Sequence, residues 1–195
     1  GIQTAEKKPR RATLVARGSA GHGSVPRLDN AVTHLARAVA KAGSWQTEMR
    51  LNGTTRAYFD RLATISDPED AWRYRNVGNP AETKAIQQYF LETFPYHYSV
   101  LRTSVVPTVM NGGFRNNVIP SEATAILDIR MLPDENVDAF YQKLTDLIDD
   151  PQVTVVPEPI YRPESAPSPI DNDMFQSLEK VAKRMYPEAT VIPSM

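Results

Sequence analysis

Cysteine is absent from the 195 residues of this chain, and only three histidines are present. The absence of cysteine excludes disulfides, thiolate catalysis and zinc sites built from cysteine. None of the histidines begins a His-x-Asp or His-x-x-x-His metal motif. The chain also has neither a Gly-x-x-x-x-Gly-Lys phosphate loop nor a Gly-x-Ser-x-Gly nucleophile elbow. Taken alone, the chain therefore lacks a complete catalytic constellation.

A surplus of charge and long apolar runs are absent as well. Lys and Arg number 22 against 23 Asp and Glu, so no global field would draw the chain to nucleic acid or to an acidic membrane. No apolar run approaches the roughly 20 residues of a membrane helix, and no secretory segment follows Gly1. What is present is an ordinary globular composition, 41% apolar and 23% charged, which leaves the cellular compartment open.

Apolar periodicity predicts the regular elements. The clearest signal is the strand 122–131, in which every second residue is apolar and those between are largely polar. Similar patterns predict strands at 12–17, 99–110 (with Pro107 at an edge or bulge) and 153–156, and helices at 28–42 and 133–148. The order predicts an α+β, ferredoxin-like split βαβ fold: a four-stranded antiparallel sheet with helices on one face.

Residues 43–97 interrupt this order as a helical insert. Asp67 and Asn79 each place a capping side chain before a proline suited to the first helical turn. We assign residues 12–157 to one domain that includes this insert.

Both ends of the chain are interpreted as cut. The sequence begins at Gly1 without an initiator methionine, residues 1–11 are polar and basic, and residues 157–169 contain five prolines, which predicts a linker. Beyond it, a helix at 171–186 and a strand-like stretch have no expected partners in the chain. Residues 1–11 and 158–195 are therefore predicted to be a connector and a fragment of a second domain.

Three polar side chains are candidates for function. His22 lies between two glycines after the first strand, either as a turn residue whose neighbour Ser24 caps the next helix or as a group presented by a loop. Asn117, in the loop before the clearest strand, is either a turn former or a ligand-binding amide. Arg130 lies on the polar face of that strand with Asp128, either in an ion pair or as a guanidinium for a carboxylate ligand.

The other two histidines are not predicted to be functional. His34 shares a polar helix face with Arg37 and Lys41 and is predicted to be solvated. His97 has no partner visible from the sequence.

Residues 16–26, 107–113 and 117–130 (including Asn-Val-Ile-Pro and Asp-x-Arg) together resemble, in order, the lid domain of a zinc metallopeptidase family. This family, peptidase family M-twenty, contains aminoacylase, glutamate carboxypeptidase, acetylornithine deacetylase and succinyl-diaminopimelate desuccinylase. Residues 58–63 of the insert are similar to the larger-lid subgroup, which includes carboxypeptidase S-like enzymes and N-acyl-amino-acid hydrolases.

The resemblance implies the lid, or dimerisation, domain of an amidohydrolase acting on N-acyl-amino acids or peptides with a free C-terminal carboxylate. It implies two zinc ions in the full-length enzyme, held by ligands outside this chain, so that the chain alone has no metal ligands and is inactive. It also implies a homodimer through the lid, although the insert leaves the assembly open, with the chain's own catalytic domain and the substrate as further partners.

The same resemblance assigns roles to the three candidate side chains. His22 matches a catalytic histidine that reaches into the partner subunit's active site and stabilises the developing oxyanion. Asn117 and Arg130 match substrate-binding residues that grip chiefly the terminal carboxylate. The alternative is a stand-alone ferredoxin-like module that binds a small ligand or mediates assembly; metal-binding segments on either side of this sequence in its parent would favour the enzyme.

Overall fold

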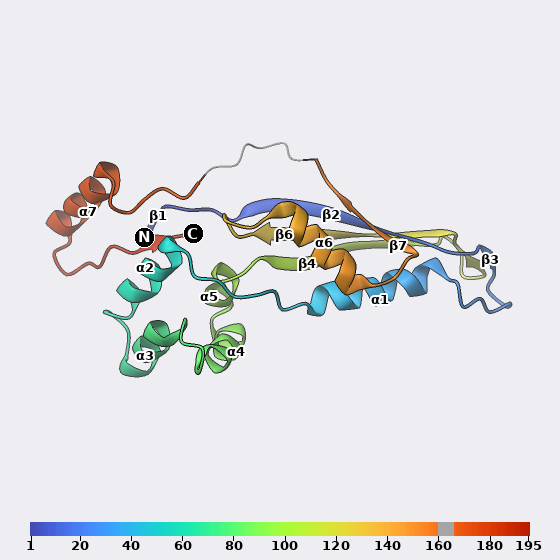
Figure 1. Ribbon diagram of the computed structural model, residues 1–195, viewed down its shortest axis with the longest axis horizontal. Helices are drawn as coiled ribbons and strands as arrows, with labels where there is room; N and C mark the ends of the chain where they lie inside the picture. The colour runs from blue at the N-terminus through green and yellow to red at the C-terminus, as the bar shows by residue number, and fades with distance from the viewer. Residues whose placement is uncertain (160–165) are drawn as a thin grey trace. The chain divides into compact units, whose positions relative to one another are not determined.

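The computed structural model describes residues 1–159 and 166–195, in two compact units (Figure 1). A sheet unit contains residues 8–47 and 104–159, and a helical unit contains residues 1–7, 48–103 and 166–195. Each unit has its own cluster of buried apolar side chains. The linker predicted at 157–169 lies in part outside the described residues.

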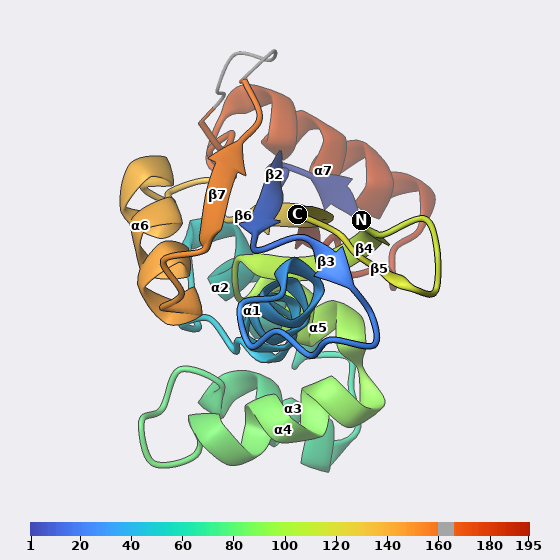
Figure 2. The same cartoon turned by 90° about the vertical axis from the view of Figure 1, so that its right-hand side faces the viewer.

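The sheet unit is built on four antiparallel strands in the order β4-β6-β2-β7 (Figure 2). β2 (Lys8–Arg17) and β6 (Glu122–Met131) form the central pair, and β4 (Ser104–Gly112) and β7 (Val153–Pro157) form the edges. Helix α1 (Ala31–Ser44) connects β2 toward β4, and α6 (Val137–Ile148) connects β6 to β7. This is the ferredoxin-like split βαβ order, which confirms the predicted α+β class.

Helices α1 and α6 bury one face of the sheet. In β6 every second side chain from Ala123 to Met131 is buried, and the side chains between them lie on the other face, as the alternation predicts. Leu35 of α1 and Leu144 of α6 pack in the same cluster as these strand residues, and burial of each such leucine contributes about 2 kcal/mol. The opposite face of β6, which carries Arg130, is left without a helix of this unit.

Several boundaries in the sheet unit differ from the predictions. β2 begins at Lys8 rather than at residue 12, because pairing with β6 continues until Lys8 lies opposite Met131. α1 begins at Ala31 rather than at residue 28, after the Asn30 cap, and Leu28 lies before the helix and is 98% exposed. α6 begins four residues later than predicted, after its own asparagine cap at Asn136.

Edge strand β4 confirms the expectation for Pro107. The register of its pairing with β6 shifts between Pro107 and Val109. Proline has no N–H to give to the ladder, so the pairing is interrupted where it stands.

In the helical unit the insert forms four helices, α2 (Gly53–Leu62), α3 (Pro68–Asn76), α4 (Thr83–Thr93) and α5 (Pro95–Val100) (Figure 1). Asp67 caps α3 as predicted and accepts the backbone N–H groups of Glu69 and Asp70. Asn79 does not cap a helix; it accepts the N–H of Ala81 in a turn, and α4 starts four residues later, at Thr83.

The C-terminal segment has partners within the chain, so the expectation that it has none is wrong. β8 (Pro193–Ser194) pairs in parallel with β1 (Ile2–Gln3). Glu179 of α7 (Asp173–Met185) forms an ion pair with Arg61 of α2 at 2.8 Å, and Arg61 also lies over the ring of the buried Phe175. These contacts join residues more than 100 positions apart, so local periodicity could not reveal them.

Helix α7 buries less than its periodicity predicts. Phe175 is buried, but the other large apolar side chains expected to face inward are exposed: Met174, Leu178, Val181 and Met185. Across residues 1–159 and 166–195, no helix combines the length and apolar character that crossing a bilayer requires.

Candidate functional site

A two-stranded ribbon at one end of the sheet unit brings His22 and Asn117 together. β3 (Gly21–His22) pairs with β5 (Val118–Ile119), and His22 lies opposite Val118. The N–H of Gly23 donates to the carbonyl of Asn117 at 2.8 Å. Two of the three predicted site residues are therefore neighbours, although 95 positions separate them in the sequence.

The ribbon leaves β2 through a glycine that no other residue can replace without movement. A Cβ on Gly18 would lie 2.6 Å from the backbone nitrogen of Ala31, at the start of α1. The N–H of Gly18 donates to the carbonyl of Ser121 at 3.0 Å. The glycine-rich sequence thus lets the loop pass close to α1 and turn toward β5.

The tautomer of His22 follows from its contacts with Ser24. The backbone N–H of Ser24 donates to Nδ1 of His22 at 3.2 Å, and the Ser24 hydroxyl lies 2.8 Å from the same nitrogen. Because a backbone N–H can only donate, Nδ1 is an acceptor, and the proton of the neutral ring resides on Nε2. The exposed ring therefore presents an N–H donor to its surroundings. Ser24 acts on His22 and does not cap α1, whose cap is Asn30.

The side chain of Asn117 is exposed and makes no hydrogen bond to any residue in the described ranges. Only its backbone carbonyl is engaged, by Gly23. Its amide is therefore available to a ligand at the same end of the sheet as His22.

Arg130 lies at the opposite end of the sheet unit. It is opposite Pro9 of β2 and Ser104 of β4, whereas Glu122, at the other end of β6, is opposite Arg17. Eight extended residues separate Glu122 from Arg130, which corresponds to about 26 Å along the strand. Within one chain, the third predicted residue is therefore not brought to the other two.

Arg130 is also in the ion pair that its sequence context suggested. Its Nε lies 3.1 Å from an oxygen of Asp128 on the same strand, and the two side chains are 51% and 38% exposed. A pair this exposed contributes little to stability, well under about 1 kcal/mol. The guanidinium remains accessible and fixed in direction by its neighbour.

The prediction that His34 is solvated is wrong. Its side chain is only 15% exposed, and its Nδ1 lies 2.6 Å from Oδ2 of Asp150, in the turn after α6. Its Nε2 lies 3.4 Å from Oδ1 of Asp29, close enough for an electrostatic contact but without a hydrogen bond. Asp29 lies close to His34 in the sequence, just before the cap of α1, so local sequence could have suggested this contact. Asp150 is 116 positions from His34, so local sequence could not suggest that one.

The two carboxyl groups beside His34, those of Asp29 and Asp150, have lowered pKa values because both accept hydrogen bonds. For Asp29, the largest cause is the hydrogen bond from the Ser19 hydroxyl, followed by a smaller, opposing effect of burial. For Asp150, the largest single effect is burial, which acts to raise the pKa. The hydrogen bonds from His34 and from the Gln152 N–H, and the charges of His34 and Arg37, all lower the pKa and together outweigh burial. Both carboxylates are thus held in their ionised form.

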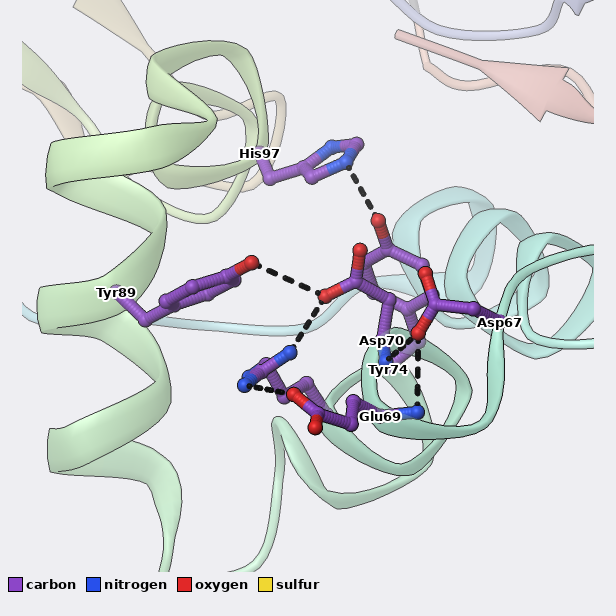
Figure 3. A network of polar contacts seen from close by, with 7 residues as sticks. Asp67, Glu69, Asp70, Tyr74, Tyr89 and His97 are labelled. Atoms are coloured by element: carbon purple, nitrogen blue, oxygen red, sulfur yellow. Dashed lines mark hydrogen bonds and ion pairs between the residues drawn. The ribbon is translucent and has the colours of Figure 1, made fainter.

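His97 is the polar centre of the helical unit. Its Nδ1 and Nε2 each lie 3.2 Å from a tyrosine hydroxyl, that of Tyr58 and that of Tyr74. Figure 3 shows the contact of His97 with Tyr74. Beside it, the carboxylate of Asp70 accepts a hydrogen bond from the Tyr89 hydroxyl and forms an ion pair with Arg73. Burial lowers the pKa of His97, partly opposed by the charge of Asp70, and burial raises the pKa of Tyr74 to about 12. The arrangement is that of a satisfied core histidine.

The described part of the chain does not fit a metal ion. It contains no group of three or more His, Asp or Glu side chains that could hold one. The nearest approach is His34 with its two carboxylates, but these lie at opposite ring nitrogens and so do not converge on one point.

The family model of the peptidase dimerisation domain matches residues 4–155. Among curated proteins, the chain is 27% identical over 176 residues to a probable carboxypeptidase S-like protein of Dictyostelium discoideum, covering 90% of this chain and 33% of that protein. It is 26% identical over 183 residues to an N-fatty-acyl-amino acid synthase/hydrolase of Danio rerio, covering 90% of this chain and 34% of that protein. The chain thus spans about a third of the length of these relatives.

Solved structures share the fold. The M20 family metallo-carboxypeptidase Sso-CP2 from Sulfolobus solfataricus matches 99% of this chain and 53% of its own, with a TM-score of 0.56 and 14% identity. Human carnosine dipeptidase 1 matches 100% of this chain and 46% of its own, with a TM-score of 0.53 and 14% identity.

Proposed function

This chain belongs to the peptidase dimerisation domain family, and from that premise we propose that it is the lid of a zinc-dependent amidohydrolase. The proposed reaction is hydrolysis of the amide bond of N-acyl-amino acids or of peptides with a free C-terminal carboxylate. The names of the relatives in Dictyostelium discoideum and Danio rerio support this substrate class.

The observation that carries the proposal is the separation of the candidate residues into two groups. His22 and Asn117 are neighbours at one end of the sheet unit, whereas Arg130 lies near the other end of β6, about 26 Å along the strand from Glu122. An acyl-amino acid cannot bridge that span within one lid. If all three residues serve one substrate, His22 and Asn117 come from one subunit and Arg130 from the other.

We assign His22 the role of hydrogen-bond donor to the oxygen that becomes negative when the amide carbonyl is attacked. Ser24 holds Nδ1 as an acceptor, so the N–H of Nε2 is the group presented to the substrate. A donor fixed in place before the reaction stabilises the transition state without reorganisation. The amide of Asn117, exposed beside it, is assigned to the same substrate.

Arg130 is assigned to the substrate's terminal carboxylate. A guanidinium can hold a carboxylate by two parallel hydrogen bonds, and Asp128 keeps that of Arg130 oriented on the face of the sheet opposite to α1 and α6. The carboxylate of the ligand would compete with Asp128 for Arg130. We therefore expect the bond between Arg130 and the ligand to strengthen when the site closes and water is excluded.

A homodimer through the edge strand β4 is part of the proposal. The outer half of β4 is exposed, and its apolar side chains include Val109 and Met110, the latter 52% exposed. Gly112 of the same strand lies against Val32 of α1, which is also exposed. An unpaired edge beside an apolar helix face is suited to continue the sheet into a second copy.

The metal ions and the remainder of the active site are assigned to a catalytic domain outside this chain. The described residues do not fit a metal, and no step of the reaction is derived through one. Residues 1–11 and 158–195 are proposed to be the connector and part of that domain. Residues 1–7 and 166–195 form one compact unit with the insert.

The test is steady-state kinetics of the full-length enzyme that contains this domain. His22→Ala is expected to lower kcat by about a hundredfold with little change in KM, the effect of losing one oxyanion donor. Arg130→Ala is expected to raise KM about tenfold or more for substrates with a free carboxylate.

Arg17→Ala serves as the matched control, since Arg17 is an exposed arginine on β2, paired with Glu122. It should leave both constants unchanged. Wild-type kinetics in both site variants would refute the assignment and leave a ligand-binding or assembly module.

A further inference from the structure

The loop that carries His22 is closed at its base by a single carboxylate. The backbone N–H and the hydroxyl of Ser19 both donate to Oδ2 of Asp29, at 3.0 and 2.7 Å. The N–H of Ser19 also lies 3.1 Å from the Asp29 carbonyl. Residues 19–29 therefore form a closed loop, and His22 lies within it.

Beyond this closure, the loop is held by the pairing of β3 with β5 and by backbone contacts at its ends and within it. Gly18 donates to Ser121 and Gly23 donates to Asn117, whereas the N–H of Val25 donates back to His22. Most side chains of the loop are exposed, so little apolar burial fixes it. Polar contacts must therefore determine where His22 is held.

His34 connects the base of this loop to the turn between α6 and β7. It lies one helical turn after the cap of α1, with Nε2 facing Asp29 and Nδ1 bonded to Asp150. Asp150 is held in turn by the N–H of Gln152, and the carbonyl of Gln152 accepts the N–H of Arg17 at the end of β2. The left-handed backbone of Asp149, φ 45°, ends α6 and turns the chain there.

We propose that His34 is a positioning residue for His22, acting through Asp29. Asp150 fixes the ring of His34, the ring places Nε2 beside the free oxygen of Asp29, and Asp29 closes the loop through Ser19. This inference rests on the proposed function, in which His22 is the donor to the reacting carbonyl.

The chemistry of the three groups fits this role. Both ring nitrogens of His34 face carboxylate oxygens, Nδ1 that of Asp150 at 2.6 Å and Nε2 that of Asp29 at 3.4 Å. Hydrogen bonds lower the pKa of Asp29 and of Asp150, so both groups beside the ring stay ionised and remain hydrogen-bond acceptors. With side chains 15% and 16% exposed, His34 and Asp150 are screened less than a surface pair.

The first experiment measures amide hydrogen exchange in this chain, for wild type, His34→Gln and Asp29→Ala. Both variants are expected to raise the exchange rates of the Ser19 and Gly23 amides about tenfold, the loss of roughly one charged hydrogen bond. The amides of β6 should keep their wild-type rates. Asp146→Ala is the matched control, because the carboxylate of Asp146 is bonded to Gln142 within α6.

The second experiment places the same substitutions in the full-length enzyme. His34→Gln is expected to lower kcat about tenfold with KM unchanged, since Arg130 is untouched. In the His22→Ala background, His34→Gln should cause no further loss, because a residue that acts only through His22 has nothing left to position.

Loop amides that keep wild-type exchange in His34→Gln would overturn the proposal, and so would faster exchange throughout the sheet unit. Additive losses of kcat in the double variant would overturn it as well. If exchange rises in the loop alone but His22→Ala leaves kcat unchanged, the anchoring by His34 stands and the proposed role of His22 fails.

Discussion

The three histidines differ in what each ring nitrogen touches, and this decides what each can do. His22 has one nitrogen held by Ser24 and the other exposed, which leaves a donor for a ligand. His34 is held between two carboxylates. His97 is buried with a tyrosine hydroxyl at each nitrogen, so the neutral ring is fully satisfied.

For His97 we predict that the helical unit loses stability as the pH falls. Burial holds its pKa below the unfolded value of about 6.5, so the unfolded chain binds a proton that the folded unit resists. The stabilisation is complete above that value and is lost as the pH falls through it. His97→Gln, which stays neutral, should lose less stability than the parent between about pH 8 and pH 5.

The measurement is urea unfolding followed by Trp72 fluorescence in a Trp45→Phe background, since Trp72 lies in α3 and Trp45 in the sheet unit. His34→Gln is the control and should not change the response of Trp72 to pH. An equal loss of stability in His97→Gln and in its parent would show that other groups cause the pH dependence.

At this scale the sequence predicts positions better than partners. Arg130 and Asp128 were expected on one polar face because a strand alternates, and that face is where they lie. His34 was predicted to be solvated, because its helix face is polar and nothing near it in sequence indicates Asp150. Contacts that close over long stretches of chain leave no local pattern.

Among the elements, β6 was predicted residue for residue, since five alternate apolar positions admit one register against a buried face. The start of α1 was less well predicted. Its buried side chains are mainly alanines (Ala31, Ala38 and Ala42), which are only weakly apolar and so contribute little to a periodic apolar pattern. The basic start of β2 forms a strand only because β6 lies beside it. Tertiary pairing there overrides composition.

For the edge strand β4 we predict that Met110→Asp dissociates the homodimer. A two-fold interface would bring the new carboxylate near its own copy, and burying it costs about 2 kcal/mol or more, roughly thirtyfold in Kd. Sedimentation of this chain should then give the monomer mass with an unchanged circular dichroism spectrum.

Val156→Asp is the matched control, since Val156 is an exposed residue of the opposite edge strand, β7. It should remain dimeric. A dimer in Met110→Asp together with a monomer in Val156→Asp would move the interface to the other edge.

For the whole molecule, the grouping of segments is a feature that local sequence patterns do not carry. The insert forms one compact unit with residues 1–7 and the C-terminal segment. The short parallel pair β1 and β8 and the ion pair of Arg61 with Glu179 join these pieces. Two-residue strands and single ion pairs carry too weak a sequence pattern to be predicted.

For this chain alone we predict no stoichiometric zinc. Its described residues offer no converging group of three metal ligands. Elemental analysis after dialysis should find far less than one zinc per chain, whereas the full-length enzyme should retain about two, as the proposed site requires. Tight, stoichiometric zinc in this chain would contradict the proposed division between lid and catalytic domain.

The most direct test of the account is whether two impaired full-length variants restore each other, assayed at substrate concentrations well below the wild-type KM. If each active site takes His22 from one subunit and Arg130 from the other, a mixed dimer of His22→Ala and Arg130→Ala chains contains one site with both residues intact. Equimolar chains that exchange subunits at random should recover about one quarter of wild-type turnover, since half the dimers are mixed and one of their two sites is complete. Turnover that stays at the level of the separate variants would contradict the shared site.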